Sequence, residues 1–250
     1  MFLMSSNNKM NTKTAHLQLG DITIEVVQKN IKNLHLSVYP PNGRVHISAP
    51  TRLDLDTIRV YAISKLNWIK KQQAKFKNQA RETPREFLNR ESHYFKGKRY
   101  LLKLIEHNAP PKVRLQHSTL ELYLRPDSSK AKAKSVLDEW YRAQLKSIVP
   151  PLIAKWEKKM QVQVNEFGIK RMKTRWGTCN PQAKRVWLNL ELAKKPIDCL
   201  EYVLVHEMVH LFERHHNDRF VALMDKFLPL WPHYKDELNR LPVGHVEWDY

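Results

Sequence analysis

Apolar and polar residues alternate along the first fifty positions, in short runs that are separated by turn-forming residues. Side chains two positions apart lie on the same face of a strand, so this spacing predicts antiparallel β-strands. The runs cover residues 17–26, 34–38 and 45–47, and the same alternation returns at residues 94–95, 100–105, 112–115 and 120–124. We detect no internal sequence repeat.

The spacing of apolar residues changes to that of a helix over residues 56–79. Apolar side chains form one stripe there and lysines occupy most of the remaining surface, which predicts one long, amphipathic and basic helix. Residues 125–133 are rich in polar and turn-forming types and are the best linker candidate.

Helical spacing resumes at residues 136–148 and is then interrupted by Pro150 and Pro151. Because proline is tolerated in a first helical turn, we expect a second helix from there to about Met160. Two strands, at residues 162–167 and 186–190, are expected to flank a loop at 173–182. Two helices are expected to follow, the first from Pro196 or Asp198 to Leu211 and the second over residues 218–228. The mixture of short strands and helices indicates an α+β protein.

Composition excludes several classes of protein. The chain has 250 residues, of which 42% are hydrophobic and 27% are charged, so a buried core is expected and global disorder is not. No apolar run is long enough to span a membrane, and the amino-terminal residues lack the apolar core of a signal peptide. The two cysteines, Cys179 and Cys199, are too few for a disulfide framework, which favours the reducing cytoplasm.

Positive charge is concentrated in the first part of the chain. The last fifty residues hold 5 Lys and Arg against 9 Asp and Glu, a net charge of −4, whereas the chain as a whole carries +18. The first two hundred residues therefore carry +22. Such an excess favours contact with DNA or RNA, but a solvated basic surface explains it equally well because no nucleic-acid motif accompanies it.

The helix that follows Pro196 contains the sequence His-Glu-Met-Val-His at residues 206–210. Two histidines four residues apart lie on one face of a helix, so His206 and His210 can bind one ion. Zinc suits imidazole ligands and, in catalytic sites, keeps a position for a water whose pKa it lowers to about 7. Glu207 beside them would then serve as the general base.

The alternative is a buried helix with two incidental histidines. Residues 203–211 are apolar nearly all round, so the helix is expected to be buried. Buried polar groups need partners, because each unpaired one costs about 1–3 kcal/mol. One metal ion with its water would satisfy both histidines and the glutamate.

A third ligand is expected from the residues that follow. His216 lies six positions after His210, which on a continuous helix would place it on a different face. The helix must therefore end soon after Leu211 and the chain must turn, with Asn217 or Asp218 capping the next helix. We expect His216 to be the third ligand, with His215 as the main alternative and Glu213 as the lesser one.

The loop at residues 173–182 is a candidate for substrate binding. Gly177 permits close approach of another backbone, Arg175 offers a planar set of donors and Trp176 a flat face. These residues could receive a peptide strand, although a turn with one packed tryptophan is the simpler interpretation. Cys179 has no neighbouring cysteine and is expected to be a small buried residue, and the apolar stripe from Phe220 to Trp231 is expected to be core.

The second half of the chain resembles the YgjP-like, SprT-related zinc metallopeptidases of the zincin group. The resemblance rests on residues 175–179, 186–190, 201–210 and 216–220, with Thr178 where the family usually has serine. It implies a small antiparallel sheet packed on helices, one zinc ion bound by His206, His210 and His216, Glu207 as the catalytic base, and the loop of Arg175, Trp176 and Gly177 near the cleft. Related SprT-like proteases act on DNA-bound proteins.

We therefore expect three parts: a disordered start at residues 1–14, a β-rich basic part at 15–128 and a zincin-like catalytic domain at 129–250. The expected function is that of a zinc-dependent peptidase acting on peptides or proteins, with nucleic-acid-associated proteins as one substrate class. The alternatives are a nucleic-acid-binding accessory protein with a structural or vestigial metal site, and a partner-dependent accessory protein of a toxin or restriction system. The sequence sets neither the oligomeric state nor the cleavage preference.

Overall fold

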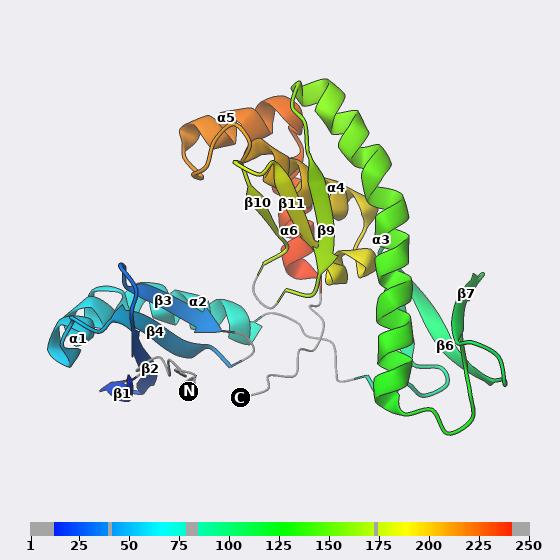
Figure 1. Ribbon diagram of the computed structural model, residues 1–250, viewed down its shortest axis with the longest axis horizontal. Helices are drawn as coiled ribbons and strands as arrows, with labels where there is room; N and C mark the ends of the chain where they lie inside the picture. Colours follow the sequence, from blue (N-terminus) through cyan, green and yellow to red (C-terminus); the bar gives the residue numbers. More distant parts are fainter. Residues whose placement is uncertain (1–12, 40–41, 79–84, 173–174, 242–250) are drawn as a thin grey trace, which may run out of the picture. The chain divides into compact units, whose positions relative to one another are not determined.

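The computed structural model describes residues 13–39, 42–78, 85–172 and 175–241. The chain forms two compact units, Met1–Gln79 and Ala80–Tyr250, and each is described by itself (Figure 1). Residues 1–12 of the expected disordered start lie outside the described residues, and the first strand already includes Lys13 and Thr14. No helix among the described residues is both long enough and apolar enough to cross a membrane.

The first unit is a four-stranded sheet covered by two helices. Its strand order is β1-β2-β4-β3, and its core is formed by residues such as Ile24, Ile47, Ile58 and Ile69. The strands are β1 (Lys13–Leu19), β2 (Ile22–Lys29), β3 (His35–Tyr39) and β4 (Arg44–Pro50). The two central strands, β2 and β4, run parallel, so the expectation of a purely antiparallel arrangement is wrong at that pair.

The long helix expected over residues 56–79 is two helices, α1 (Leu55–Ser64) and α2 (Leu66–Asn78). Lys65 leaves helical geometry, with φ −103° and ψ 4°, and its amide donates to the Ala62 carbonyl oxygen. Ile58 of α1 and Ile69 of α2 both enter the core on the sheet. Gln79 lies outside the described residues.

The second unit begins with another four-stranded sheet, and its topology repeats that of the first. The order is β5-β6-β8-β7, again with parallel central strands, β6 and β8, and antiparallel outer ones. The strands are β5 (Ser92–Phe95), β6 (Lys98–Glu106), β7 (Lys112–Gln116) and β8 (Thr119–Leu124). The two four-stranded sheets thus share one topology, although the sequence shows no internal repeat.

Helix α3 (Lys130–Met160) is continuous through Pro150 and Pro151, so the expected interruption does not occur. Both prolines are exposed, while a buried stripe continues past them through Leu145, Val149 and Ile153. Packing of that stripe outweighs the backbone hydrogen bonds that the prolines remove. Figure 1 shows α3 running from the four-stranded sheet at its start to the strands of the next sheet at its end.

The third sheet has the order β10-β11-β9 and carries the helix of the histidine motif on one side. Its strands are β9 (Glu166–Lys170), β10 (Gly177–Asn180) and β11 (Arg185–Asn189), with β9 parallel and β10 antiparallel to β11. Strand β10 lies within the segment that was expected to be a loop. The chain then continues through a 3₁₀ turn, η1 (Leu190–Lys194), into α4 (Ile197–Val209), which begins and ends close to its predicted bounds.

Two short helices, α5 (Asp218–Phe227) and α6 (Trp231–Arg240), complete the second unit. Helix α5 confirms the predicted helix at residues 218–228, but α6 was not predicted, and Trp231 begins it rather than extending α5. The α+β class is confirmed, whereas the grouping of elements differs from the expected parts. Strands β5–β8 belong to the same compact unit as α3 and α4, although residues 15–128 were expected to form one part.

A buried ion cluster ties α3 and η1 to the segment that follows β9. The carboxylate of Glu191, 3% exposed, binds both Arg171 and Lys194, and Arg171 also binds Asp138 of α3 with an N–O distance of 2.8 Å. Burial acts to raise the pKa of Glu191, but Lys194 and Arg171 outweigh it and lower the pKa to about 2. A charge-paired carboxylate of this kind stabilises the fold only while it is ionised.

We predict that Glu191→Gln removes a specific part of the acid sensitivity of the fold. Because the native pKa lies below the unfolded one, the stabilisation is complete above about pH 4.5 and is lost as the pH falls toward 2. Between pH 6 and pH 3, the free energy of unfolding of the parent protein should therefore fall by roughly 2 kcal/mol more than that of the variant. Urea denaturation of metal-free protein measures both, and parallel losses in the two proteins would contradict the assignment.

Candidate metal centre

Helix α4 presents His206 and His210 on one face because they are four residues apart. Most other residues of the helix are buried, including Leu204, Val205 and Met208, so the helix is embedded in the core along its length. The two imidazole rings are 5.1 Å apart between centroids. The apolar burial of this helix thus fixes the direction in which its few polar side chains point.

His216 joins the two histidines because the chain turns directly after α4. The helix ends at Val209, and the backbone amides of Phe212 and Glu213 both donate hydrogen bonds to the Val209 carbonyl oxygen. Asn217 then caps α5, its Oδ1 accepting from the amide of Phe220 at 3.0 Å. The turn brings the centroid of the His216 ring to 4.9 Å from the ring centroid of His206 and to 4.8 Å from that of His210.

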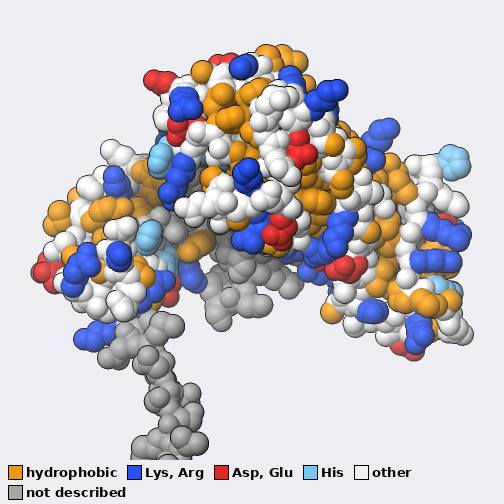
Figure 2. Space-filling model, turned by 45° about the horizontal axis from the view of Figure 1, so that its top comes forward, with side chains coloured by type: hydrophobic (Ala, Val, Ile, Leu, Met, Phe, Trp, Pro, Cys, Tyr) orange, Lys and Arg blue, Asp and Glu red, His pale blue; other side chains and the backbone are white. Residues whose placement is uncertain are grey.

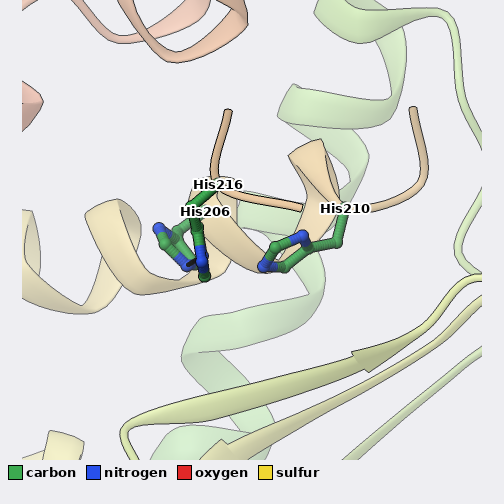
Figure 3. A group of neighbouring side chains, drawn as sticks. All are labelled: His206, His210 and His216. Atoms are coloured by element: carbon green, nitrogen blue, oxygen red, sulfur yellow. Dashed lines mark hydrogen bonds between the residues drawn. The ribbon is translucent and has the colours of Figure 1, made fainter. Parts of the chain in front are cut away.

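The three histidines offer ring nitrogens that lie within 4.8 Å of one another (Figure 3). The Nε2 atoms of His206 and His216 are 2.9 Å apart. Nitrogens bound to one zinc ion at about 2.1 Å in tetrahedral geometry would be about 3.4 Å apart, so the observed spread fits a single ion. Among the described residues, the group contains His216 and neither His215 nor Glu213.

Protonation and orientation of the rings also suit a cation. Burial lowers the pKa of His206 to about 3, aided by His210, His216 and Lys235, and burial likewise lowers the pKa of His216. Neutral rings keep a lone pair for an ion. The Nδ1 of His210 lies 3.0 Å from the Glu213 carbonyl oxygen, and an N–H donated there leaves Nε2 as the ligand atom.

Phe220 of α5 supports all three rings. Its ring centroid lies 4.9 Å from His206, 4.9 Å from His210 and 4.7 Å from His216, and the residue is 4% exposed. The sequence analysis placed Phe220 in the core without linking it to the histidines. Its position three residues after the Asn217 cap, on the inner face of the next helix, is the signal that could have revealed the contact.

Glu207 follows His206 in α4 and packs against the edge strand β10. It is 6% exposed, and burial raises its pKa to about 8, with Arg175 acting in the opposite direction. A Cβ atom added at Gly177 would lie 2.7 Å from Glu207 Cγ and 2.7 Å from Oε1. Glycine is therefore required where β10 crosses the carboxylate.

A cleft of about 1070 Å³ opens beside the three histidines and Glu207. Its walls come from the segment that leads into and past β10, from α4 and from the turn after α4. The lining includes all three of the residues singled out for substrate binding, Arg175, Trp176 and Gly177, whereas Lys173 and Thr174 lie outside the described residues. Cys179 also lines the cleft, but burial raises the pKa of its thiol to about 11, which disfavours a metal-binding thiolate.

Sequence reasoning did not single out Asn189, which holds the wall of the cleft in place. Its side-chain Nδ2 donates to the carbonyl oxygens of Met172 at 2.9 Å and Arg175 at 2.8 Å. Its backbone N–H donates to the carbonyl oxygen of Trp176 at 2.9 Å. The side chain is 4% exposed and also caps η1 through Glu191. A buried asparagine directly after a strand was the available signal, but its partners are far away in sequence.

We predict that His216→Ala weakens metal binding and that His215→Ala does not. His216 supplies one of three clustered nitrogens, so its loss should cost more than the roughly 10- to 100-fold that removal of a supporting partner costs. His215 is the matched control because it is the adjacent histidine in the same turn. Competition with a chromophoric chelator measures both affinities, and equal losses in the two variants would exclude the choice of His216.

Comparison with known proteins identifies the family of the chain. The model of one family, described as the YgjP-like metallopeptidase domain, matches residues 32–241. Among solved structures, the zymogen of the metallopeptidase abylysin from Pyrococcus abyssi is 19% identical, with 38% of this chain and 99% of that chain covered and a TM-score of 0.34. The curated proteins contain no match. Because the family model covers most of its length, the chain belongs to the YgjP-like metallopeptidase family.

Proposed function

We propose that the protein is a zinc-dependent peptidase whose metal ligands are His206, His210 and His216 and whose general base is Glu207. The observation that carries this proposal is the meeting of three imidazoles, with nitrogens within 4.8 Å of one another, and a buried carboxylate in one cleft. Family membership supports a metal-dependent peptidase in general. Zinc is preferred because it is the metal that three-histidine catalytic sites commonly hold.

The chain's own residues divide the work of hydrolysis. When bound, the ion supplies an acidified water and polarises the carbonyl group of the substrate. Glu207 takes the proton of the attacking water on its carboxylate and passes it to the leaving amine. Burial raises the pKa of Glu207, and a divalent cation at the adjacent histidines would oppose this effect, so that the carboxylate can be ionised when needed.

Strand β10 is the surface on which we propose that the substrate lies. It is an edge strand, paired with β11 on one side, and its residues line the cleft on the other. An extended peptide could add to this edge by backbone hydrogen bonds, with Arg175 and Trp176 beside its side chains. The glycine at position 177 lets the peptide and Glu207 approach the same point.

Replacement of Glu207 by Gln should abolish hydrolysis but leave metal binding intact. The amide cannot accept the proton, so kcat should fall by at least about 100-fold, while the three histidines remain. Peptide cleavage and elemental analysis of the purified variant measure the two effects. The matched control is Glu201→Gln in the same helix, because Glu201 binds Trp156 and Lys155 and does not line the cleft.

Two results would contradict the proposal. Cleavage by Glu207→Gln at the rate of the parent protein would show that another group is the base. Purified protein that holds no divalent ion, and takes none up, would exclude a metal-dependent reaction at this cleft. A His206→Ala variant shows whether any ion detected belongs to the three histidines.

A second proposal, contact with nucleic acid, rests on charge alone. The first two hundred residues carry +22, yet on the face in Figure 2 the Lys and Arg side chains are spread over the molecule with acidic ones between them. Random-sequence DNA and RNA should then be retained in gel-shift experiments at 50 mM salt and released by 200 mM. Absence of binding at low salt would end this proposal and leave the peptidase assignment unchanged.

A further inference from the structure

The charged side chains of the cleft are unbalanced. Among the described residues, its one acidic lining residue is Glu207, which is buried and which we have assigned to catalysis, whereas two arginines, Arg175 and Arg214, are exposed at its walls. They come from different elements, the segment before β10 and the turn between α4 and α5. A peptide in the cleft therefore meets guanidinium groups from two separate parts of the wall.

The backbone at Arg175 and at the residue after it is held by Asn189. The carbonyl oxygen of Arg175 accepts from Asn189 Nδ2 at 2.8 Å, and that of the next residue, Trp176, accepts from the Asn189 amide at 2.9 Å. Asn189 is itself buried in the core. A guanidinium on a fixed backbone loses less conformational freedom when it binds a ligand than one on a mobile loop does.

Arg214 is held in a comparable way by its two neighbours. The amide of Glu213 donates to the Val209 carbonyl oxygen at 3.1 Å, and the carbonyl oxygen of Glu213 lies 3.0 Å from His210 Nδ1. The amide of His215 donates to the carboxylate of Glu213 at 3.1 Å. The backbone next to Arg214 is thus held by a contact with His210, one of the three clustered histidines.

Neither guanidinium forms a salt bridge with another side chain in the part of the chain that the structure describes. The nearest carboxylate along the chain, that of Glu213, is bound by the His215 amide and interacts electrostatically with Arg219. Arg175 acts electrostatically on the buried Glu207, and neither guanidinium is held by a carboxylate among these residues, so both are available to a ligand. The lining of the cleft also includes aromatic side chains such as Trp176 and Phe212.

From these observations we propose that the cleft selects peptides with an aspartate or glutamate side chain close to the scissile bond, and that Arg175 and Arg214 are the specificity-determining residues. This inference rests on the proposed peptidase function. Planar guanidinium groups bind carboxylates through paired hydrogen bonds, so the recognised group is an acidic side chain rather than any polar one.

The test uses one neutral peptide that the full-length, zinc-loaded protein cleaves. Each residue within three positions of the cleaved bond is replaced in turn by Glu, Gln or Lys, and kcat/KM is measured for every peptide. At one position or more, Glu should be preferred over Gln by about three- to tenfold at low salt, with Lys disfavoured. The preference should shrink at 0.5 M salt, because screening weakens exposed charge pairs.

Variants then locate the preference. Arg175→Gln and Arg214→Gln should each lower the ratio of kcat/KM for the Glu peptide to that for the Gln peptide. Arg175→Glu or Arg214→Glu should make the Lys peptide the preferred substrate. The ratio is internal to each variant, so a general loss of activity does not affect it. Arg219→Gln is the matched control, because this exposed arginine lies near the same turn without lining the cleft, and its ratio should equal that of the parent.

The outcomes separate this inference from the function on which it rests. Cleavage of neither the peptides nor an unfolded protein substrate by zinc-loaded protein would overturn the peptidase assignment itself. Cleavage without preference for Glu would leave that assignment in place and overturn the acidic specificity. A preference that survives in both Gln variants would also overturn it, since the selecting residues would then lie elsewhere.

Discussion

The second unit depends on the burial of helix α4, whose last turn and C-cap carry His206, Glu207 and His210. Nearly every other residue of α4 is buried, so His206, Glu207 and His210 cannot turn toward solvent without exposing the apolar remainder of the helix. Burial lowers the pKa of His206 and raises that of Glu207, and polar groups in a core are costly unless they find partners. A cation at the imidazoles would be such a partner, so the burial that orders the fold also favours the metal site that we propose.

Much of the surrounding structure serves to hold the two sides of this helix. On one side, the turn after Val209, the Asn217 cap and Phe220 bring the third imidazole into place. On the other side, Asn189 holds the segment that leads into β10, and glycine at position 177 lets that strand approach the carboxylate of Glu207. The chemistry at the cleft is thus set by backbone placement as much as by the identity of the reactive side chains.

Sequence reasoning succeeds where chemistry and spacing are local. His206 and His210 share a helical face at any site with this spacing, and the need for a turn before His216 follows from helix geometry alone. It fails where distant packing decides, as in the continuity of α3 through Pro150 and Pro151. Alternation of apolar residues reveals the buried face of a strand but not its direction relative to its neighbours. The parallel central pairs of both four-stranded sheets could therefore not be predicted.

X-ray absorption at the zinc edge of the zinc-loaded, full-length protein tests the central claim most directly, because it reports the atoms bound to the ion. The account predicts a first shell of nitrogen and oxygen atoms at about 2.0–2.1 Å, with the outer-shell scattering of three imidazole rings. One ring should disappear from that signal when His216 is replaced. A sulfur atom at about 2.3 Å, as Cys179 would supply, or a shell with fewer than three rings in the parent protein, would contradict it.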